Sequence, residues 1–316
     1  TFKEISGQLI RTLSSDPVNP LEGQFWYNST IGVLKGSVLT AAAWAAGGNL
    51  SIARGSLGGA GTQTAGLGFG GASFPPLQRR NETEEYDGSA WAAGGNLGTT
   101  RNSIAGCGTQ TAALGFGGYI GPVTNATEEY NGSTWSPGGN LSTARYDMGS
   151  AGTQTAGLGF GGFATTASSN ATEEYNGSAW AGGGNLGTAR YTLGGAGTQT
   201  AGLAFGGRSP TTAATEEYNG TSWTAGGNLN TARNGLAGNG TQTAALAFGG
   251  SGPGTNTELY NGTSWTTTSS LSTGRTQLAS GKDAPQTAGL AIGGNYTAAT
   301  EEFTGAFLST KTLTTS

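Results

Sequence analysis

Pairs of adjacent glutamates are the most often repeated chemical feature of this sequence. Paired carboxylates could serve acid–base chemistry or bind a metal ion. Neighbouring residues of a β-strand point to opposite faces, however, so the two carboxylates of such a pair would diverge. We therefore interpret the pairs as structural and expect one glutamate of each to form an ion pair with a repeated arginine. Eleven of the 18 acidic residues belong to this set: Glu84, Glu85, Glu128, Glu129, Glu173, Glu174, Glu216, Glu217, Glu258, Glu301 and Glu302.

Residues needed for several other kinds of catalysis are missing from the composition. The chain has no histidine and a single cysteine, Cys107. A serine triad would lack its base, zinc and copper sites would lack their usual ligands, and Cys107 would lack a histidine to activate it. Cys107 replaces a small residue of the repeated string AGAGTQT, so we interpret it as a buried filler. The sequence therefore predicts no enzyme activity, no catalytic residue, no metal site and no cofactor.

Charge and hydropathy restrict the partners. Only 10% of the residues are charged and the formal net charge is −4, so the basic patch that nucleic acid requires is not expected. No run of about 18 apolar residues is present, which predicts no membrane insertion. The first ten residues include Lys3 and Glu4 and show no signal peptide. The 61 glycines would suit a flexible chain, but the regular recurrence of aromatic residues argues against one.

That recurrence is an internal repeat of 42 to 47 residues. Each copy runs through a tryptophan, GGNL, an arginine, GTQTA, a glycine pair and TEEYNG, with small changes. A period of this length fits a four-stranded propeller blade. Tryptophans could also stack on sugars, but a sixfold feature favours packing. The repeated residues are Trp44, Trp91, Trp135, Trp180, Trp223 and Trp265, and Arg54, Arg101, Arg145, Arg190, Arg233 and Arg275.

Within one copy the pattern predicts four short strands, at 189–194, at 198–205, at 215–218 and around Trp223. Asn219-Gly220 predicts a two-residue hairpin between the last two. Alternation along 198–205 places Leu203 and Phe205 on one face and the small Gly202 and Ala204 on the other. The bulky face of one sheet could then pack on the small face of the next, which would bury a core with few large residues.

The order of glycine pair, tyrosine, tryptophan and arginine resembles the Kelch repeat. The resemblance covers residues 44–307 and implies an all-β, six-bladed Kelch-like β-propeller, or seven blades if the N-terminal arm contributes one. Two departures stand out. Tyrosine and tryptophan are only five residues apart, and the last copy has Phe303 for tyrosine and Phe307 for tryptophan, which marks a chain end or a ring seam. Residues 308–316 would then be a C-terminal tail.

The copies differ most between the glycine pair and TEEY. These segments shorten from eleven to five residues along the chain: 72–82, 119–126, 163–171, 208–214, 251–256 and 295–299. In a propeller they emerge on one face, where loops on a rigid scaffold carry binding. Unconstrained loop drift is the alternative interpretation. The candidate binding residues are Phe74, Arg79, Arg80, Tyr119, Phe163 and Arg208.

Residues 1–43 form an arm of different composition. We expect a strand in SGQLIRTL, residues 6–13, and a hairpin over 23–39, with Ile10, Trp26, Tyr27 and Leu34 as candidate assembly residues. The string SSDPVNPLEGQFWYNSTIGVLKG resembles the start of virion structural proteins of marine tailed phages. That resemblance implies a tail fibre, head fibre or decoration subunit.

Two functions follow as hypotheses. The first is a non-enzymatic virion protein whose propeller loops bind a host-surface glycan or protein. The second is a subunit of a cellular extracellular filament or adhesin. Both place the protein in a virion or outside the cell. Both make other virion or filament subunits its partners through the arm, and both predict a homo-oligomer.

Overall fold

The computed structural model describes residues 10–313, and all of its regular elements are β-strands. This confirms the all-β class. No helix in the described range is long and apolar enough to cross a membrane. The chain divides into two compact units, a repeat unit of residues 44–304 and an arm unit of residues 1–43 with 305–316.

The repeat unit is built from four-stranded sheets, in line with the expected repeat. The first contains β5 (Gly58–Gly61), β6 (Gly66–Phe69), β9 (Thr83–Tyr86) and β10 (Trp91–Ala93). The second contains β11 (Ala105–Gly108), β12 (Ala113–Phe116), β13 (Thr127–Tyr130) and β14 (Trp135–Pro137). The third contains β15 (Gly149–Gly152), β16 (Gly157–Phe160), β17 (Thr172–Tyr175) and β18 (Trp180–Gly182).

Three further sheets follow the same order. The fourth contains β19 (Gly194–Gly197), β20 (Gly202–Phe205), β21 (Thr215–Tyr218) and β22 (Trp223–Ala225). The fifth contains β23 (Leu236–Thr241), β24 (Ala244–Gly249), β25 (Thr257–Tyr260) and β26 (Trp265–Thr267). The sixth contains β27 (Ala279–Ser280), β28 (Ala288–Ile292), β29 (Thr300–Thr304) and β4 (Ala43–Ala46), and a two-stranded sheet joins β7 (Ala72–Ser73) to β8 (Gln78–Arg79).

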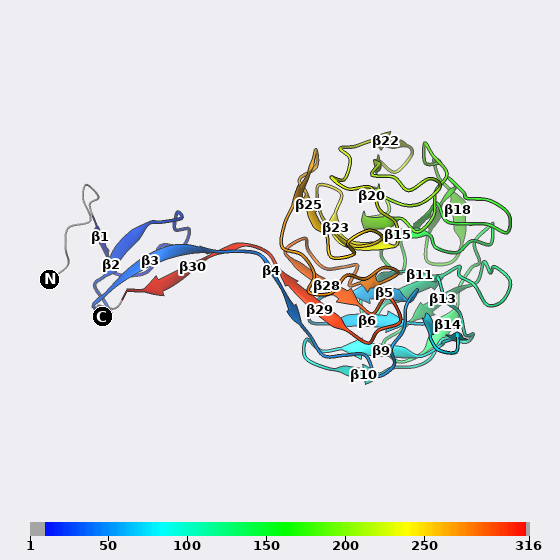
Figure 1. Cartoon of the computed structure of the whole chain (residues 1–316), viewed down its shortest axis with the longest axis horizontal. Coiled ribbons are helices and arrows are strands. Elements are labelled where there is room, and N and C mark those ends of the chain that lie inside the picture. The colour runs from blue at the N-terminus through cyan, green and yellow to red at the C-terminus, as the bar shows by residue number, and fades with distance from the viewer. Residues whose placement is uncertain (1–9, 314–316) are drawn as a thin grey trace. The chain divides into compact units, whose positions relative to one another are not determined.

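The first strands of the six sheets lie next to one another around a common centre (Figure 1). β5 contacts β11, and the contacts continue through β15, β19 and β23 to β27, which in turn contacts β5. The repeat unit is therefore a propeller-like arrangement in which first strands are innermost.

In the fourth sheet the third and fourth strands lie where the pattern predicted them, at β21 and β22, but the first two begin later. In the fourth sheet β19 starts at Gly194, and the polar string at 198–201 is a turn and not part of a strand. The Thr198 hydroxyl accepts a hydrogen bond from the backbone N–H of Ala201, which holds this turn. The hairpin after Tyr218 also has four residues and not two, because the side chain of Asn219 accepts the N–H groups of Thr221 and Ser222.

Bulky and small faces of neighbouring sheets pack together, as expected. A Cβ added to Gly202 would lie 2.7 Å from a methyl carbon of Leu158 in the preceding sheet, and one added to Gly195 would lie 2.7 Å from the Phe160 ring. Glycine is thus required where the large side chains of the preceding sheet press against the strand.

The expected arginine–glutamate pairs are present in all six sheets, with N–O distances of 2.6 to 3.0 Å. The arginines are fully buried, and burial lowers their pKa while the glutamate raises it. Each first glutamate is thus held by an arginine of its own copy. The pairs are Arg54–Glu84, Arg101–Glu128, Arg145–Glu173, Arg190–Glu216, Arg233–Glu258 and Arg275–Glu301.

The second glutamate faces the next sheet and accepts a hydrogen bond from its tyrosine. The hydroxyl of Tyr130, for example, donates to Glu85 at 2.5 Å. Burial and this bond raise the pKa of Tyr130 to about 12. The same bond joins Tyr86 to Glu302, from the first sheet to the sixth.

The six tryptophans pack between sheets. Trp135 lies against Tyr130 of its own sheet and Phe69 of the preceding one, and its indole N–H donates to Thr83. Trp44 occupies this position in the sixth sheet, against Phe303 and Phe248. Phe307, which the sequence placed there, instead begins β30 of the arm unit. The chain's first repeated tryptophan therefore completes its last sheet.

The arm unit has its own sheet. It contains β1 (Arg11–Leu13), β2 (Phe25–Asn28), β3 (Val33–Thr40) and β30 (Phe307–Thr312), so the expected tail contributes a strand. β2 and β3 form the expected hairpin, while residues 6–9 of the expected first strand lie outside the described range. Asp16 accepts bonds from Trp26, Asn28 and Lys35, and these bonds lower its pKa to about 2.

Candidate ligand-binding face

Each sheet contributes two variable segments to one face of the repeat unit, which we call the loop face. One follows the repeated arginine and the other follows the glycine pair. The two segments meet in isolated β-bridges, such as Asn102 with Tyr119, Tyr146 with Phe163 and Tyr191 with Arg208. The positive φ angles of the glycine pairs, 63° and 112° at Gly206 and Gly207, turn the chain here.

A row of side chains in contact with one another, at steep angles between the rings, crosses the first four sheets on this face. We call it the aromatic arc; it consists of Arg79, Tyr119, Tyr146, Phe163, Tyr191 and Arg208. Ring centroids along it lie 5.8, 5.6 and 5.1 Å apart. At its ends the guanidinium carbons lie 4.8 Å from the Tyr119 ring centre and 6.0 Å from that of Tyr191. The middle residues are half-buried and Arg208 is exposed.

The arc brings together four of the six candidate binding residues. Phe74 lies outside it, 59% exposed and stacked at 5.7 Å on Tyr296. Arg80 is also outside, because its guanidinium is bonded to Ser73 and Glu82. The sequence analysis missed Tyr146 and Tyr191. Their signal was available, since the position after the repeated arginine varies as strongly as the loop does.

At the centre of the loop face the backbone forms a closed circuit of hydrogen bonds. One residue of each sheet donates its backbone N–H to the carbonyl of the equivalent residue in the preceding sheet, over 2.7 to 3.1 Å. The residue of the first sheet donates in the same way to that of the sixth. All six have a positive φ, from 52° to 66°. We call these residues the axial ring: Ser56, Ser103, Asp147, Thr192, Gly235 and Gln277.

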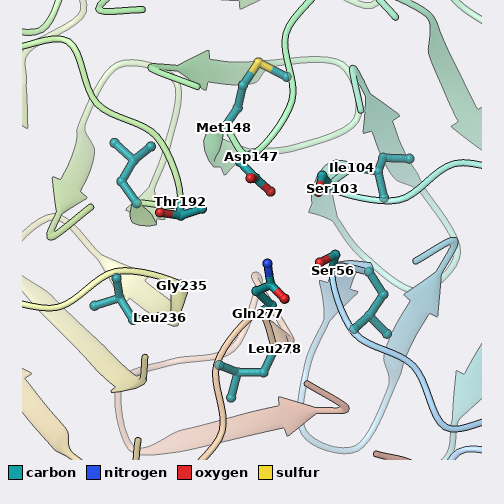
Figure 2. A pocket seen from close by; sticks show the side chains of 12 residues that line it. Ser56, Ser103, Ile104, Asp147, Met148, Thr192, Gly235, Leu236, Gln277 and Leu278 are labelled. Atoms are coloured by element: carbon teal, nitrogen blue, oxygen red, sulfur yellow. The ribbon is translucent and has the colours of Figure 1, made fainter. Parts of the chain in front are cut away.

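The axial ring surrounds a polar well with a cavity volume of about 90 Å³. The Asp147 carboxylate and the Gln277 amide point into it from opposite sides (Figure 2). Burial raises the pKa of Asp147 to about 6, although a bond with the Ser103 side chain acts in the opposite direction. Asp147 therefore ionises close to neutral pH.

A second cavity, of about 320 Å³, lies beside the well and shares Ser103 with it. Tyr119 and Tyr146 of the arc line it, together with Asn102. The side-chain oxygen of Asn102 is shielded from solvent and has no hydrogen-bond partner. Because Asn102 lines the same cavity as the two tyrosines, its unpartnered oxygen is a candidate acceptor for a hydroxyl or amide donor of a ligand.

One inserted loop crosses the axis below the well. Residues 281–287 connect β27 to β28, where the other hairpins have the short TQT turn. The Lys282 ammonium donates to Gly195 at 3.0 Å, and Asn239 donates to the carbonyls of Ala284 and Pro285 at 3.1 and 2.8 Å. Burial lowers the pKa of Lys282 to about 8. Only the length of this loop signalled it in the sequence.

The remaining candidate residues lie in the interior of the repeat unit or in the arm unit. Cys107 is fully buried, and burial raises the pKa of its thiol to about 12. Trp26 and Leu34 are buried in the arm unit, whereas Ile10 and Tyr27 are exposed there. Within residues 10–313 no three acidic, cysteine or histidine side chains come together as metal ligands.

The loop face thus combines an aromatic surface, two cationic ends and a polar centre. The repeated glutamate pairs do not contribute to it, because the first glutamate is held by an arginine of its own copy and the second by a tyrosine of the next sheet. No known protein family matches the chain, and no curated protein matches it significantly.

Proposed function

We propose that this chain is a non-enzymatic display protein in which a closed, six-bladed Kelch-like propeller presents the aromatic arc to a surface glycan. The arc is the observation that carries the proposal. Half-buried aromatic rings offer sugars an apolar surface, and neighbouring polar groups can bind their hydroxyls. A protein partner at this face is an outcome of the test below.

Closure of the propeller is supported by contacts between the sixth sheet and the first. Tyr86 donates to Glu302, Trp91 donates to Thr300 at 2.9 Å, and Gln63 donates to the carbonyl of Phe303 at 3.1 Å. The circuit of the axial ring also runs through all six sheets. A closed ring would hold the arc rigidly, which reduces the entropy cost of binding.

Glycan arrays test the ligand class. Wild-type protein should bind a defined set of glycans, and Tyr146→Ala should lose most of that signal because it removes the middle of the arc. Tyr27→Ala is the matched control, since Tyr27 is an exposed tyrosine of the arm unit. No glycan signal for the wild type, or equal signals for all three proteins, would refute the proposal.

We propose further that the arm unit attaches the chain to a second copy within a virion or filament. Ten of the 13 exposed large apolar side chains in the described range belong to this unit. β30 is an edge strand of its sheet and could pair with an equivalent strand. The resemblance of the arm to virion proteins favours the virion, and an extracellular filament is the alternative.

Light scattering tests this assembly. Leu39 and Leu308 are partners in the β3–β30 register and are 46% and 39% exposed. Replacing both by lysine should turn the oligomer into a monomer, whereas Ile120→Lys on the repeat unit should not. An unchanged mass for the arm variant, or a monomeric wild type, would contradict the proposal. Imaging of the native particle distinguishes capsid or tail attachment from a head-to-tail filament.

A further inference from the structure

The two ends of the aromatic arc carry charge that the protein does not neutralise. Of the arginines in residues 10–313, seven form ion pairs and three form none: Arg11, Arg79 and Arg208. The last two both lie over tyrosine rings of the arc. The Nε atom of Arg79 is also shielded from solvent and has no hydrogen-bond partner.

Nearby carboxylates do not compensate these guanidinium groups. Glu82, the acidic residue of the first loop, is paired with Arg80 at 3.3 Å. Asp147 lies in the axial well beside Ser103 and accepts from it. Of the paired glutamates, the first binds an arginine of its own copy and the second accepts from a tyrosine of the next sheet. Although the chain has a net charge of −4, the aromatic arc therefore has one arginine without an ion pair at each end, which makes it locally cationic.

We propose, on the basis of the glycan-binding function above, that the ligand is an acidic glycan. Its sugar rings lie along Tyr119, Tyr146, Phe163 and Tyr191, and its carboxylate or sulfate groups bind Arg79 and Arg208. Guanidinium binds both anions through two parallel N–H donors, and such charge-assisted bonds are stronger than neutral ones. The cavity lined by Asn102, Tyr119 and Tyr146 receives one sugar ring, whose hydroxyl or amide N–H donates to the Asn102 oxygen.

The test uses acidic oligosaccharides and their neutral counterparts. The panel contains uronate, sialate and sulfated oligosaccharides, the first two also after reduction of the carboxyl group and the third after desulfation. Calorimetry with the full-length chain should show at least one acidic member binding about tenfold or more tightly than its neutral form. Its affinity should fall as salt rises from about 0.05 M to about 0.5 M, while that of the neutral form should not. Which acidic members bind distinguishes carboxylate from sulfate.

Arginine variants assign the contacts. Arg79→Gln and Arg208→Gln should each weaken binding of the acidic member about tenfold and leave its neutral form unchanged. Arg11→Gln removes another unpaired arginine, in the arm unit, and should change neither. Equal binding of acidic and neutral forms, with no effect of either variant, would overturn the acidic preference but leave glycan binding intact. Binding to a neutral member alone would do the same, and binding to no glycan at all would overturn both proposals.

Discussion

Two regions of the repeat unit differ in how strongly their residues vary among the six copies. In the core the same side chains recur: an arginine pairs with the first glutamate of its own copy, and a tyrosine of the next sheet donates to the second. On the loop face, equivalent positions vary among the copies: the position of Tyr146 and Tyr191 is held in the other copies by Gly55, Asn102, Asn234 and Thr276. The comparison teaches that residues repeated in every copy hold the sheets together, whereas residues that vary between copies form the loop face.

One interface between sheets tests how tightly the core residues depend on one another. Between the fifth and sixth sheets the second glutamate is Leu259 and the tyrosine is Phe303, so no hydroxyl needs an acceptor. Thr268 also replaces the glycine of the other copies. At Gly226, the equivalent of Thr268, an added Cβ would lie 2.8 Å from the hydroxyl of Tyr260. Leu259, Thr268 and Phe303 therefore change together: Phe303 has no hydroxyl, so Leu259 need not accept a hydrogen bond and Thr268 has room for its side chain.

The largest expected effect is on the buried ion pairs. Arg145→Met should cost about 3–5 kcal/mol of unfolding free energy, because it leaves Glu173 buried without its partner at 2.8 Å. Arg208→Met, an exposed arginine on the loop face, should change it by less than about 0.5 kcal/mol. Urea unfolding measures both values. Similar values for the two variants would break the distinction between core and face.

The interface without the hydroxyl gives the next effect. Phe303→Tyr should cost about 1–3 kcal/mol, because the new hydroxyl faces Leu259 and Thr268 without an acceptor. Adding Leu259→Glu and Thr268→Gly to that variant should recover most of the loss, since this restores the set found at the other interfaces. If the triple variant is no more stable than Phe303→Tyr alone, the three residues are independent and their coupling is wrong.

The axial well predicts a pH-dependent effect of similar size and opposite sign. The pKa of Asp147 is about 6 in the folded chain, against an ordinary value of 3.8. Its protonated form is therefore favoured on folding, and this stabilisation is lost as pH rises through about 6. Asp147→Asn should raise stability by on the order of 1–3 kcal/mol at about pH 7.5 and by little at about pH 4. Thermal unfolding of both proteins at the two pH values measures this difference in stability. A stabilisation that is the same at both pH values would contradict the raised pKa of Asp147 as its cause.

Whether a structural feature could be predicted from the sequence depends on whether its residues recur in every copy. The arginine–glutamate pairs could be predicted because six copies show them in one order. The late start of β20 at Gly202 could not, because Thr198 looks like a strand residue until its hydroxyl is seen to accept a hydrogen bond within a turn. The place of Trp44 in the last sheet was also hidden, since it joins opposite ends of the repeat unit.

The candidate site shows the same limit more strongly. Tyr119, Phe163 and Arg208 were identified because they lie in variable loops. Their contacts run between different copies, through Tyr146 and Tyr191, and no spacing along one copy reveals that order. The inserted loop at 281–287 was visible only as a length change, while its path across the axis depends on Asn239 in another sheet.

The most direct measurement compares stability and glycan affinity for Tyr146→Leu and Arg145→Met, which are neighbours in sequence but belong to the face and the core. We predict that Tyr146→Leu unfolds within about 0.5 kcal/mol of wild type and loses most of its glycan affinity. Arg145→Met should lose stability and, at a temperature where it remains folded, keep its affinity. If Tyr146→Leu retains full affinity, or loses it only by unfolding, the loop face is not the binding surface.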